Sequence, residues 1–521
     1  MEDLHHIFEM GLLMVILAAG ITAIAKKFKQ PYPIVLVVVG AIIGLLDIPF
    51  LEPVKLLVTE EETFHFMVIT LFLPALLGEA ALKLPYSKLR DNKGPILSLA
   101  FGGTFLSFLV IGFSLYWIFD FSIPTSFVFA ALMSATDPVS VLSIFKSVGV
   151  QKRLAIVVEG ESLFNDGLAV VLFKISAFSL LMYIDMGVPG IGSGVFEFAK
   201  VVFLGVLIGG ALGYGFSILV KYFDDYPLEI IFSILLFYGS FLLAENIHAS
   251  GVIAVVVGAI IFGNYGASIG MSPTTKLNIN NFWDVAALLA NSLVFLMVGL
   301  EITRIQFSDK WGFIIVAVLL VLIARSIAVY TSLVFQKDFP TKWKHIINWG
   351  GLKGSLSIAL VLSLPKDFPD RDLILILAFS VVFFSLIVQG LTIKPFIGML
   401  GVRPKQKGNE EFEELLARLH RAEIGIEELN RIKRKLFITE VVYREFIQKY
   451  EEEIEHIQHA LTNLFETSPE LKEKQMKALE RHTLYAESDA IRKLVQEEII
   501  SNETADRQQE NIINELSKIE S

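Results

Sequence analysis

The segment 157–173, VVEGESLFNDGLAVVLF, places three acidic residues, a serine and an asparagine in an otherwise apolar run of membrane-spanning character. Burying a charged side chain at membrane depth costs free energy, so such a residue indicates either a functional role or a paired charge. On a helix, Glu161 and Asn165 share one face, and Ser162 and Asp166 share the next. One helix therefore presents a candidate cation-binding pair, Ser162 and Asp166, beside a candidate anchoring acid, Glu161.

An alternative is that these acids belong to a helix end exposed in a loop near Arg153. Glu159 fits this alternative best because it is nearest to that end. Asp166 fits it poorly, since 13 residues of helix place it about 20 Å further along the axis. We therefore expect Asp166 to lie at membrane depth.

The composition of the whole chain is that of a polytopic membrane protein. Of its 521 residues, 54% are hydrophobic and 19% are charged, and the mean hydropathy is +0.61. The absence of cysteine excludes disulfides, thiolate metal sites and cysteine catalysis. A net charge of −10 without a basic cluster argues against nucleic acid as a partner. We find no phosphate-cradling glycine loop and no hydrolase arrangement, so the sequence predicts neither an ATP-driven pump nor an enzyme, and it implies no cofactor.

Apolar runs of about 20 residues, enough to cross a hydrocarbon core of roughly 30 Å, predict an all-α protein with thirteen membrane spans. They lie at about 8–25, 33–47, 63–82, 95–119, 124–147, 155–183, 195–220, 227–247, 250–268, 282–302, 311–335, 344–364 and 371–399. With the N-terminus outside, Lys and Arg collect in the inner loops, which places the C-terminus in the cytoplasm. Residues 405–521 hold 26 acidic and 18 basic residues with helical periodicity, so we expect a transmembrane part at 1–404 and a cytoplasmic, acidic helical tail.

Two predicted spans are interrupted, the fifth by SATDPVSV at 134–141 and the twelfth by WGGLKGSLS at 349–357. Irregular backbone at membrane depth survives only where protein or a water-filled cavity satisfies it, and paired interruptions in two halves of a chain indicate a transporter site. Asp137 and Pro138 could simply begin a helix. Inside the bilayer, however, the unwound turn frees backbone carbonyls such as that of Thr136 for a monovalent cation. We predict two inverted six-helix repeats, spans 1–6 and 8–13, with the seventh span as their connector.

Two basic residues at membrane depth need partners. Arg325, in the middle of the eleventh span, costs about 2.5–3.5 kcal/mol on insertion scales, and we expect Glu161 to pair with it. Pairing with Glu79, or snorkelling toward an interface, is the alternative. Lys353, in the second interruption, either offsets the dipole of a half-helix or faces the cytoplasm.

The motifs SATDPV, ESLFNDG, AENIHASGVIAV (244–255), LLANSLVFLMVGLEI (288–302) and WGGLKG occur in an order that resembles the first monovalent cation:proton antiporter family, which includes NhaP-like sodium/proton antiporters and animal sodium/proton exchangers. The resemblance covers about residues 8–400. It implies a homodimer in the membrane lipid, with scaffold helices 1–3 and 7–10 and with core helices 4–6 and 11–13 around crossed broken helices. It also implies alternating access and an electroneutral exchange of one sodium ion for one proton, in the service of pH and sodium homeostasis at the plasma membrane.

The resemblance also implies roles for individual residues. Asp166 is the exchanging carboxylate, Ser162 and the Thr136 carbonyl are sodium ligands, and Asp137 contributes through water. Asn165 stiffens the crossing, while Glu161 and Arg325 form a structural pair. The family usually has Arg where this chain has Lys353, and Lys cannot make the same planar bidentate contact.

Rival functions remain open from the sequence. A potassium/proton antiporter, or one that takes lithium, belongs to the same class and differs only in site size and dehydration. A cation channel needs a continuous polar stripe, which the spans lack. A third alternative is a receptor that signals through the tail, and under this hypothesis the Asp166→Asn variant would keep its function. The tail's own partner is unknown, and a regulatory role is our expectation for it.

Overall fold

The computed structural model describes residues 2–28, 30–46, 52, 61–223, 225–302, 310–402, 407–435 and 438–497, with short pieces between 499 and 516. Every regular element of these residues is helical, which confirms the predicted all-α fold. The chain divides into two compact units, Met1–Val402 and Arg403–Ser521. The apolar helices belong to the first unit, and the charged tail forms the second.

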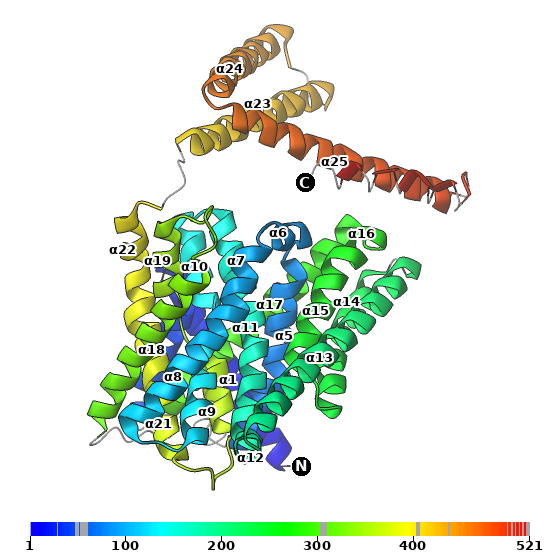
Figure 1. Cartoon of the computed structure of the whole chain (residues 1–521). Helices are drawn as coiled ribbons and strands as arrows, with labels where there is room; N and C mark the ends of the chain where they lie inside the picture. The colour runs from blue at the N-terminus through cyan, green and yellow to red at the C-terminus, as the bar shows by residue number, and fades with distance from the viewer. Residues whose placement is uncertain are drawn as a thin grey trace. The chain divides into compact units, whose positions relative to one another are not determined.

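The first unit is a bundle in which α6, α10 and α22 lie toward one end, while α12 and the N-terminus lie toward the other (Figure 1). Its first half comprises α1 (Glu2–Lys27), α2 (Tyr32–Leu45), α4 (Glu61–His65), η2 (Phe66–Phe72), α5 (Leu73–Lys83), α6 (Tyr86–Asp91), α7 (Lys93–Leu97), η3 (Ser98–Gly103), α8 (Thr104–Phe119), α9 (Ile123–Ser134), α10 (Val139–Val148), α11 (Lys152–Phe178) and α12 (Leu180–Asp185). The segments η2 and η3 are π-helical turns that continue neighbouring α-helices.

The second half of this unit begins with α13, its longest helix. It comprises α13 (Val188–Tyr222), α14 (Tyr226–Asn246), α15 (Gly251–Ile261), η4 (Phe262–Gly266), α16 (Ala267–Ile269), α17 (Pro273–Ile302), α18 (Trp311–Ser332), α19 (Thr341–Trp349), α20 (Ser355–Leu362), α21 (Arg371–Phe384), η5 (Ser385–Gln389) and α22 (Gly390–Leu400). Both predicted interruptions are present, as the gap between α9 and α10 and the gap between α19 and α20.

Ten helical segments of the described chain are long and apolar enough to cross a membrane. Three further predicted spans do not meet that criterion. Helix α2 has only 14 residues, α11 carries several charges, and the twelfth predicted span is divided into the short helices α19 and α20. The multi-pass membrane character is therefore clear, whereas the count of thirteen spans and their inverted repeat stay predictions.

Helices α13 and α15 approach each other closely because glycine lies at their contact. A Cβ atom on Gly209 would lie 2.2 Å from the carbonyl oxygen of Ala254 on α15, far inside any allowed contact. Small residues at such positions let helix backbones approach in membranes, where the hydrophobic effect contributes little to helix association. The neighbouring Gly210 meets no atom within 4 Å, so only one of the two glycines is required for packing.

We expect Gly209→Val to lower the thermal stability of the detergent-solubilised protein, because the new side chain forces α13 away from α15. Overpacking of this kind costs about 1–3 kcal/mol. Gly210→Val is the matched control and should leave the unfolding midpoint unchanged. The measurement is the loss of the monodisperse size-exclusion peak after heating, and equal midpoints for the two variants would contradict the packing argument.

The tail unit contains α23 (Lys407–Lys435), α24 (Glu440–Thr467) and α25 (Pro469–Gln496). Its small core joins α23 to α24 through apolar residues that recur at helical spacing, among them Phe412, Leu415, Ile457 and Leu461. The Lys433 ammonium, near the end of α23, lies 2.8 Å from the carboxylate of Glu440 at the start of α24. The hydrogen bond from Lys433 lowers the pKa of Glu440.

Candidate functional site

The two interrupted helices meet at their breaks. The backbone N–H of Asp137, in the first break, donates to the carbonyl of Leu352 in the second, at 2.8 Å. The Ser357 hydroxyl of α20 donates to the carbonyl of Leu132 on α9, at 2.7 Å. A Cβ on Gly354 would lie 2.4 Å from the Cβ of Asp137, so the approach requires glycine. Each break thus helps to satisfy backbone groups that lipid would leave unpaired.

Helix α11 holds the first break from the side. The Ser162 hydroxyl donates to the carbonyl of Thr136, and the Asn165 amide donates to the Thr136 hydroxyl at 2.7 Å. Ser162 and Asn165 are both buried. The structure therefore brings together three residues that the sequence singled out, in a buried contact around Thr136.

A cavity of about 880 Å³ reaches this contact. Thr136, Asp137, Ser162 and Asp166 line it, whereas Glu161 and Asn165 do not, as expected for two neighbouring faces of α11. The same cavity is lined by lysines near the ends of α1 and α10, so it extends from the breaks toward the end of the bundle that carries α10 (Figure 1).

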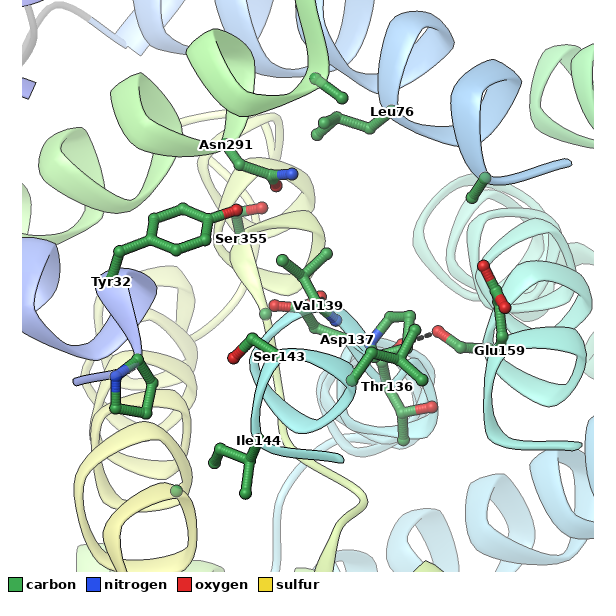
Figure 2. Close-up of a pocket in the computed structure, with 18 of the residues that line it drawn as sticks. Tyr32, Leu76, Thr136, Asp137, Val139, Ser143, Ile144, Glu159, Asn291 and Ser355 are labelled. Atoms are coloured by element: carbon green, nitrogen blue, oxygen red, sulfur yellow. Dashed lines mark hydrogen bonds between the residues drawn. The ribbon is translucent and has the colours of Figure 1, made fainter. Parts of the chain in front are cut away.

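The polar lining comes from several helices. Figure 2 shows Tyr32 of α2 and Asn291 of α17 on one side of the pocket and Glu159 of α11 on the other, with Asp137 and Thr136 between them. Tyr32 and Asn291 were not predicted as site residues. Tyr32 follows a lysine-rich stretch and Asn291 stands in a mostly apolar run, and only the packing of α2 and α17 around the breaks brings them to the cavity.

The two carboxylates at the break differ in their partners. One oxygen of Asp137 accepts from the backbone N–H of Val139 at 3.0 Å, at the start of α10. Its other carboxylate oxygen has no partner among the described residues. Asp166 makes neither a hydrogen bond nor an ion pair with the described residues. These carboxylate oxygens, with the hydroxyl of Ser162 and the carbonyl of Thr136, form an oxygen-lined group suited to a hard cation.

Arg325 pairs with Glu161, not with Glu79. Its guanidinium makes two contacts to the Glu161 carboxylate, at 2.6 and 3.1 Å, and both side chains are almost fully buried. The same guanidinium donates to the carbonyl of Ile347 in α19 at 3.4 Å. Glu79 instead lies 2.6 Å from Lys83, one turn along its own helix. The buried pair therefore ties α11 to α18 and α19.

Lys353 points into the protein. Its ammonium donates to the carbonyl of Ala135 at 3.0 Å, at the C-terminal end of α9, and the residue is 3% exposed. A positive charge at this position is favourable because helix C-termini carry partial negative charge. Of the two alternatives for Lys353, the geometry matches the contact with a half-helix end.

The π-helical segment η5 contributes two residues that the sequence analysis did not single out. Ser385 accepts from the backbone N–H of Lys353 at 3.0 Å, and Gln389 donates to the carbonyl of Trp349 at 3.0 Å. These two side chains therefore hold both ends of the second break. The available signal was weak, since the direction in which Ser385 and Gln389 face depends on the local π-helical geometry, which helical spacing does not predict.

Removing one member of the Glu161–Arg325 pair should destabilise the protein strongly, because the other charge is left buried and unpaired. Glu161→Leu is expected to lower the free energy of unfolding by about 3–5 kcal/mol, read as a lower melting temperature in detergent. The double variant Glu161→Leu, Arg325→Met should recover much of that loss. A single variant as stable as the parent protein would show that the pair is dispensable.

Three comparisons with known proteins bear on this site. The family model described as "Sodium/hydrogen exchanger, transmembrane" matches residues 12–398. The chain is 67% identical to the Na(+)/H(+) antiporter NhaG of Bacillus atrophaeus over 99% of both chains. It is 54% identical to the Na(+)/H(+) antiporter NhaH of Halobacillus aidingensis over 77% of this chain and 100% of that relative.

A solved structure has the same fold. It is that of the sodium proton antiporter MjNhaP1 from Methanocaldococcus jannaschii, which superposes with a TM-score of 0.61 at 22% sequence identity. The superposition covers 77% of this chain and 100% of the other. At this level of identity the likeness concerns the arrangement of helices, and the chemistry has to be argued from the residues at the breaks.

Proposed function

Because the chain belongs to the sodium/hydrogen exchanger family, whose members are transporters and not enzymes, we propose that it exchanges sodium ions for protons across the membrane at Asp166. The observation that carries this proposal is the position of Asp166. Its carboxylate lines a cavity beside Ser162 and Thr136 and makes no ion pair with the described residues. The nearby buried bases are occupied, Arg325 by Glu161 and Lys353 by the carbonyl of Ala135.

The proposed mechanism is competition for one carboxylate. Asp166 holds either a proton or a dehydrated sodium ion, and each neutralises its charge. Sodium would be bound by Asp166, the Ser162 hydroxyl and the Thr136 carbonyl, with Asp137 contributing through water. An empty, charged site is costly to carry through a low-dielectric barrier, so the loaded forms move and the empty form does not. Exchange is then obligatory.

The neighbour of Asp166 supports a stoichiometry of one to one. Position 165 is an asparagine whose amide nitrogen donates to the Thr136 hydroxyl. A neutral side chain at this position adds no charge to the two carboxylates, Asp137 and Asp166, that already line the site. One proton replaces one sodium ion, and no net charge crosses the membrane.

We further propose that the core helices move relative to the scaffold helices, which gives alternating access. The contacts between breaks, and the Glu161–Arg325 pair, connect only α9, α10, α11, α18, α19 and α20, all predicted core helices. The cavity lies where these elements face α1, α2, α5 and α17, which are predicted scaffold helices. A homodimer in the plasma membrane, with the N-terminus outside, a regulatory cytoplasmic tail and a role in pH and sodium homeostasis, completes the proposal.

Asp166→Asn should abolish cation-driven proton movement, because an amide neither binds and releases a proton nor carries the negative charge that balances a sodium ion. We would add sodium, lithium or potassium to everted vesicles across pH 6 to 9 and follow the internal pH with a fluorescent dye. Asp185→Asn, an exposed acid of α12 outside the cavity, is the matched control and should retain exchange. Equal proton movement from Asp166→Asn and the parent protein would refute the proposal. The cation that produces the largest signal in the parent protein is its preferred substrate.

Electroneutral exchange also predicts insensitivity to membrane potential. In proteoliposomes, a potential imposed with potassium and valinomycin should leave the sodium-driven rate unchanged. A rate that rises or falls with the sign of the potential would show that net charge moves, and would contradict the one-to-one stoichiometry.

A further inference from the structure

The acids that line the cavity are not equivalent. They are Glu79, Asp137, Glu159, Asp166 and Asp284. The Lys83 ammonium lies 2.6 Å from Glu79 and 2.5 Å from Asp284, so both carboxylates have an ion-pair partner, and its single positive charge balances one of the two. Among the described residues, Glu159 has neither a hydrogen bond nor an ion pair.

Glu159 lies on the same face of α11 as the proposed exchange site. It precedes Ser162 by three residues and Asp166 by seven, which places all three side chains on one stripe of the helix and puts Glu159 about 10 Å from Asp166 along the axis. From Asp166, Glu159 lies toward Lys152, the first residue of α11. The start of α11 closely follows the end of α10 in the sequence. Glu159 is therefore between the exchange site and the end of the bundle toward which the cavity extends.

The charges around Glu159 have a definite arrangement. Glu79, Lys146 and Lys83 are the charged groups that act on it. Two further lysines, Lys26 and Lys394, also line the cavity. A cation that enters past Lys26, Lys146 and Lys394 is repelled unless nearby acids offset these charges. Glu79 and Asp284 share Lys83 and keep one net negative charge between them, whereas Glu159 is the acid on this part of α11 and makes no ion pair with the described residues.

We propose that Glu159 is a recruiting residue that draws sodium ions and protons into the cavity and raises their concentration at Asp166. A carboxylate in a cleft with low-dielectric walls focuses the field and enriches counter-ions. This inference rests on the proposed exchange function, and it assigns to Glu159 a role in ion access, separate from the binding chemistry at Asp166.

Neutralising Glu159 should weaken access for both ions by the same factor. At acidic pH, where protons saturate Asp166, weaker access of sodium raises the apparent KM for sodium, while weaker access of the competing proton lowers it by the same factor. The apparent KM is then unchanged. At alkaline pH, where protons compete little, we expect the apparent KM to rise roughly three- to tenfold, as for one charge acting over about 10 Å. The maximal rate is set after binding and should change far less.

The experiment measures sodium-driven proton release from everted vesicles at alkaline pH, with sodium varied on the outside. Glu159→Gln should raise the apparent KM, Glu159→Asp should restore most of the affinity, and Lys146→Gln, which removes a nearby positive charge, should lower it. Glu197→Gln is the matched control, since this acid of α13 does not line the cavity. Added choline chloride should shrink the difference between Glu159→Gln and the parent, because salt screens the field.

An unchanged KM in Glu159→Gln, or loss of maximal rate without a change in KM, would overturn the recruiting role. A KM raised equally by Glu159→Gln and Glu197→Gln would do the same, because the effect would then be independent of the cavity. Failure of the exchange function itself is distinguishable, since the parent protein would then release no protons on addition of sodium. Immunoblotting of the vesicles corrects each rate for protein amount.

Discussion

The structure of the membrane unit depends on one constraint, the satisfaction of backbone groups where two helices stop inside the bundle. Lipid offers no hydrogen bonds, so each unpaired backbone group at that depth would cost several kcal/mol. The two breaks meet this constraint together, through the contact from Asp137 to Leu352, and with side chains from Ser162, Lys353 and Gln389. Asp166, the proposed exchanging carboxylate, takes no part in these contacts, whereas Ser162 and Thr136 both hold the break and face the cavity.

Some buried charged side chains of this protein are held by ion pairs or hydrogen bonds, whereas Asp166 makes neither with the described residues. Glu161 and Arg325 hold each other, and Lys353 holds the end of α9. Asp166 faces the cavity from a helix that these contacts fix in place. Such a separation lets a carboxylate change its occupant without unfolding its surroundings, because the stabilising contacts do not involve the group that exchanges.

Much of the fold and part of the site could be predicted from the sequence. Hydropathy located the helices, and Pro138 and the glycines of WGGLKG located both breaks, because these residues act on the backbone locally. The choice of Glu161 over Glu79 as the partner of Arg325 was harder. Helical spacing places Glu161 on a stripe of α11, but which neighbouring helix faces that stripe is decided by packing between segments 164 residues apart.

The sequence by itself determined that this is a helical membrane protein with ionisable residues at membrane depth, two interrupted helices and an acidic tail, since composition, period and local backbone preference are properties of neighbouring residues. Only the tertiary structure decided that Lys353 turns inward to Ala135, that Ser385 and Gln389 hold the second break, and that Glu159 lines the cavity. These facts depend on how each helix is rotated and how closely its neighbours approach. That is set by the summed packing of distant segments, and no local pattern encodes it.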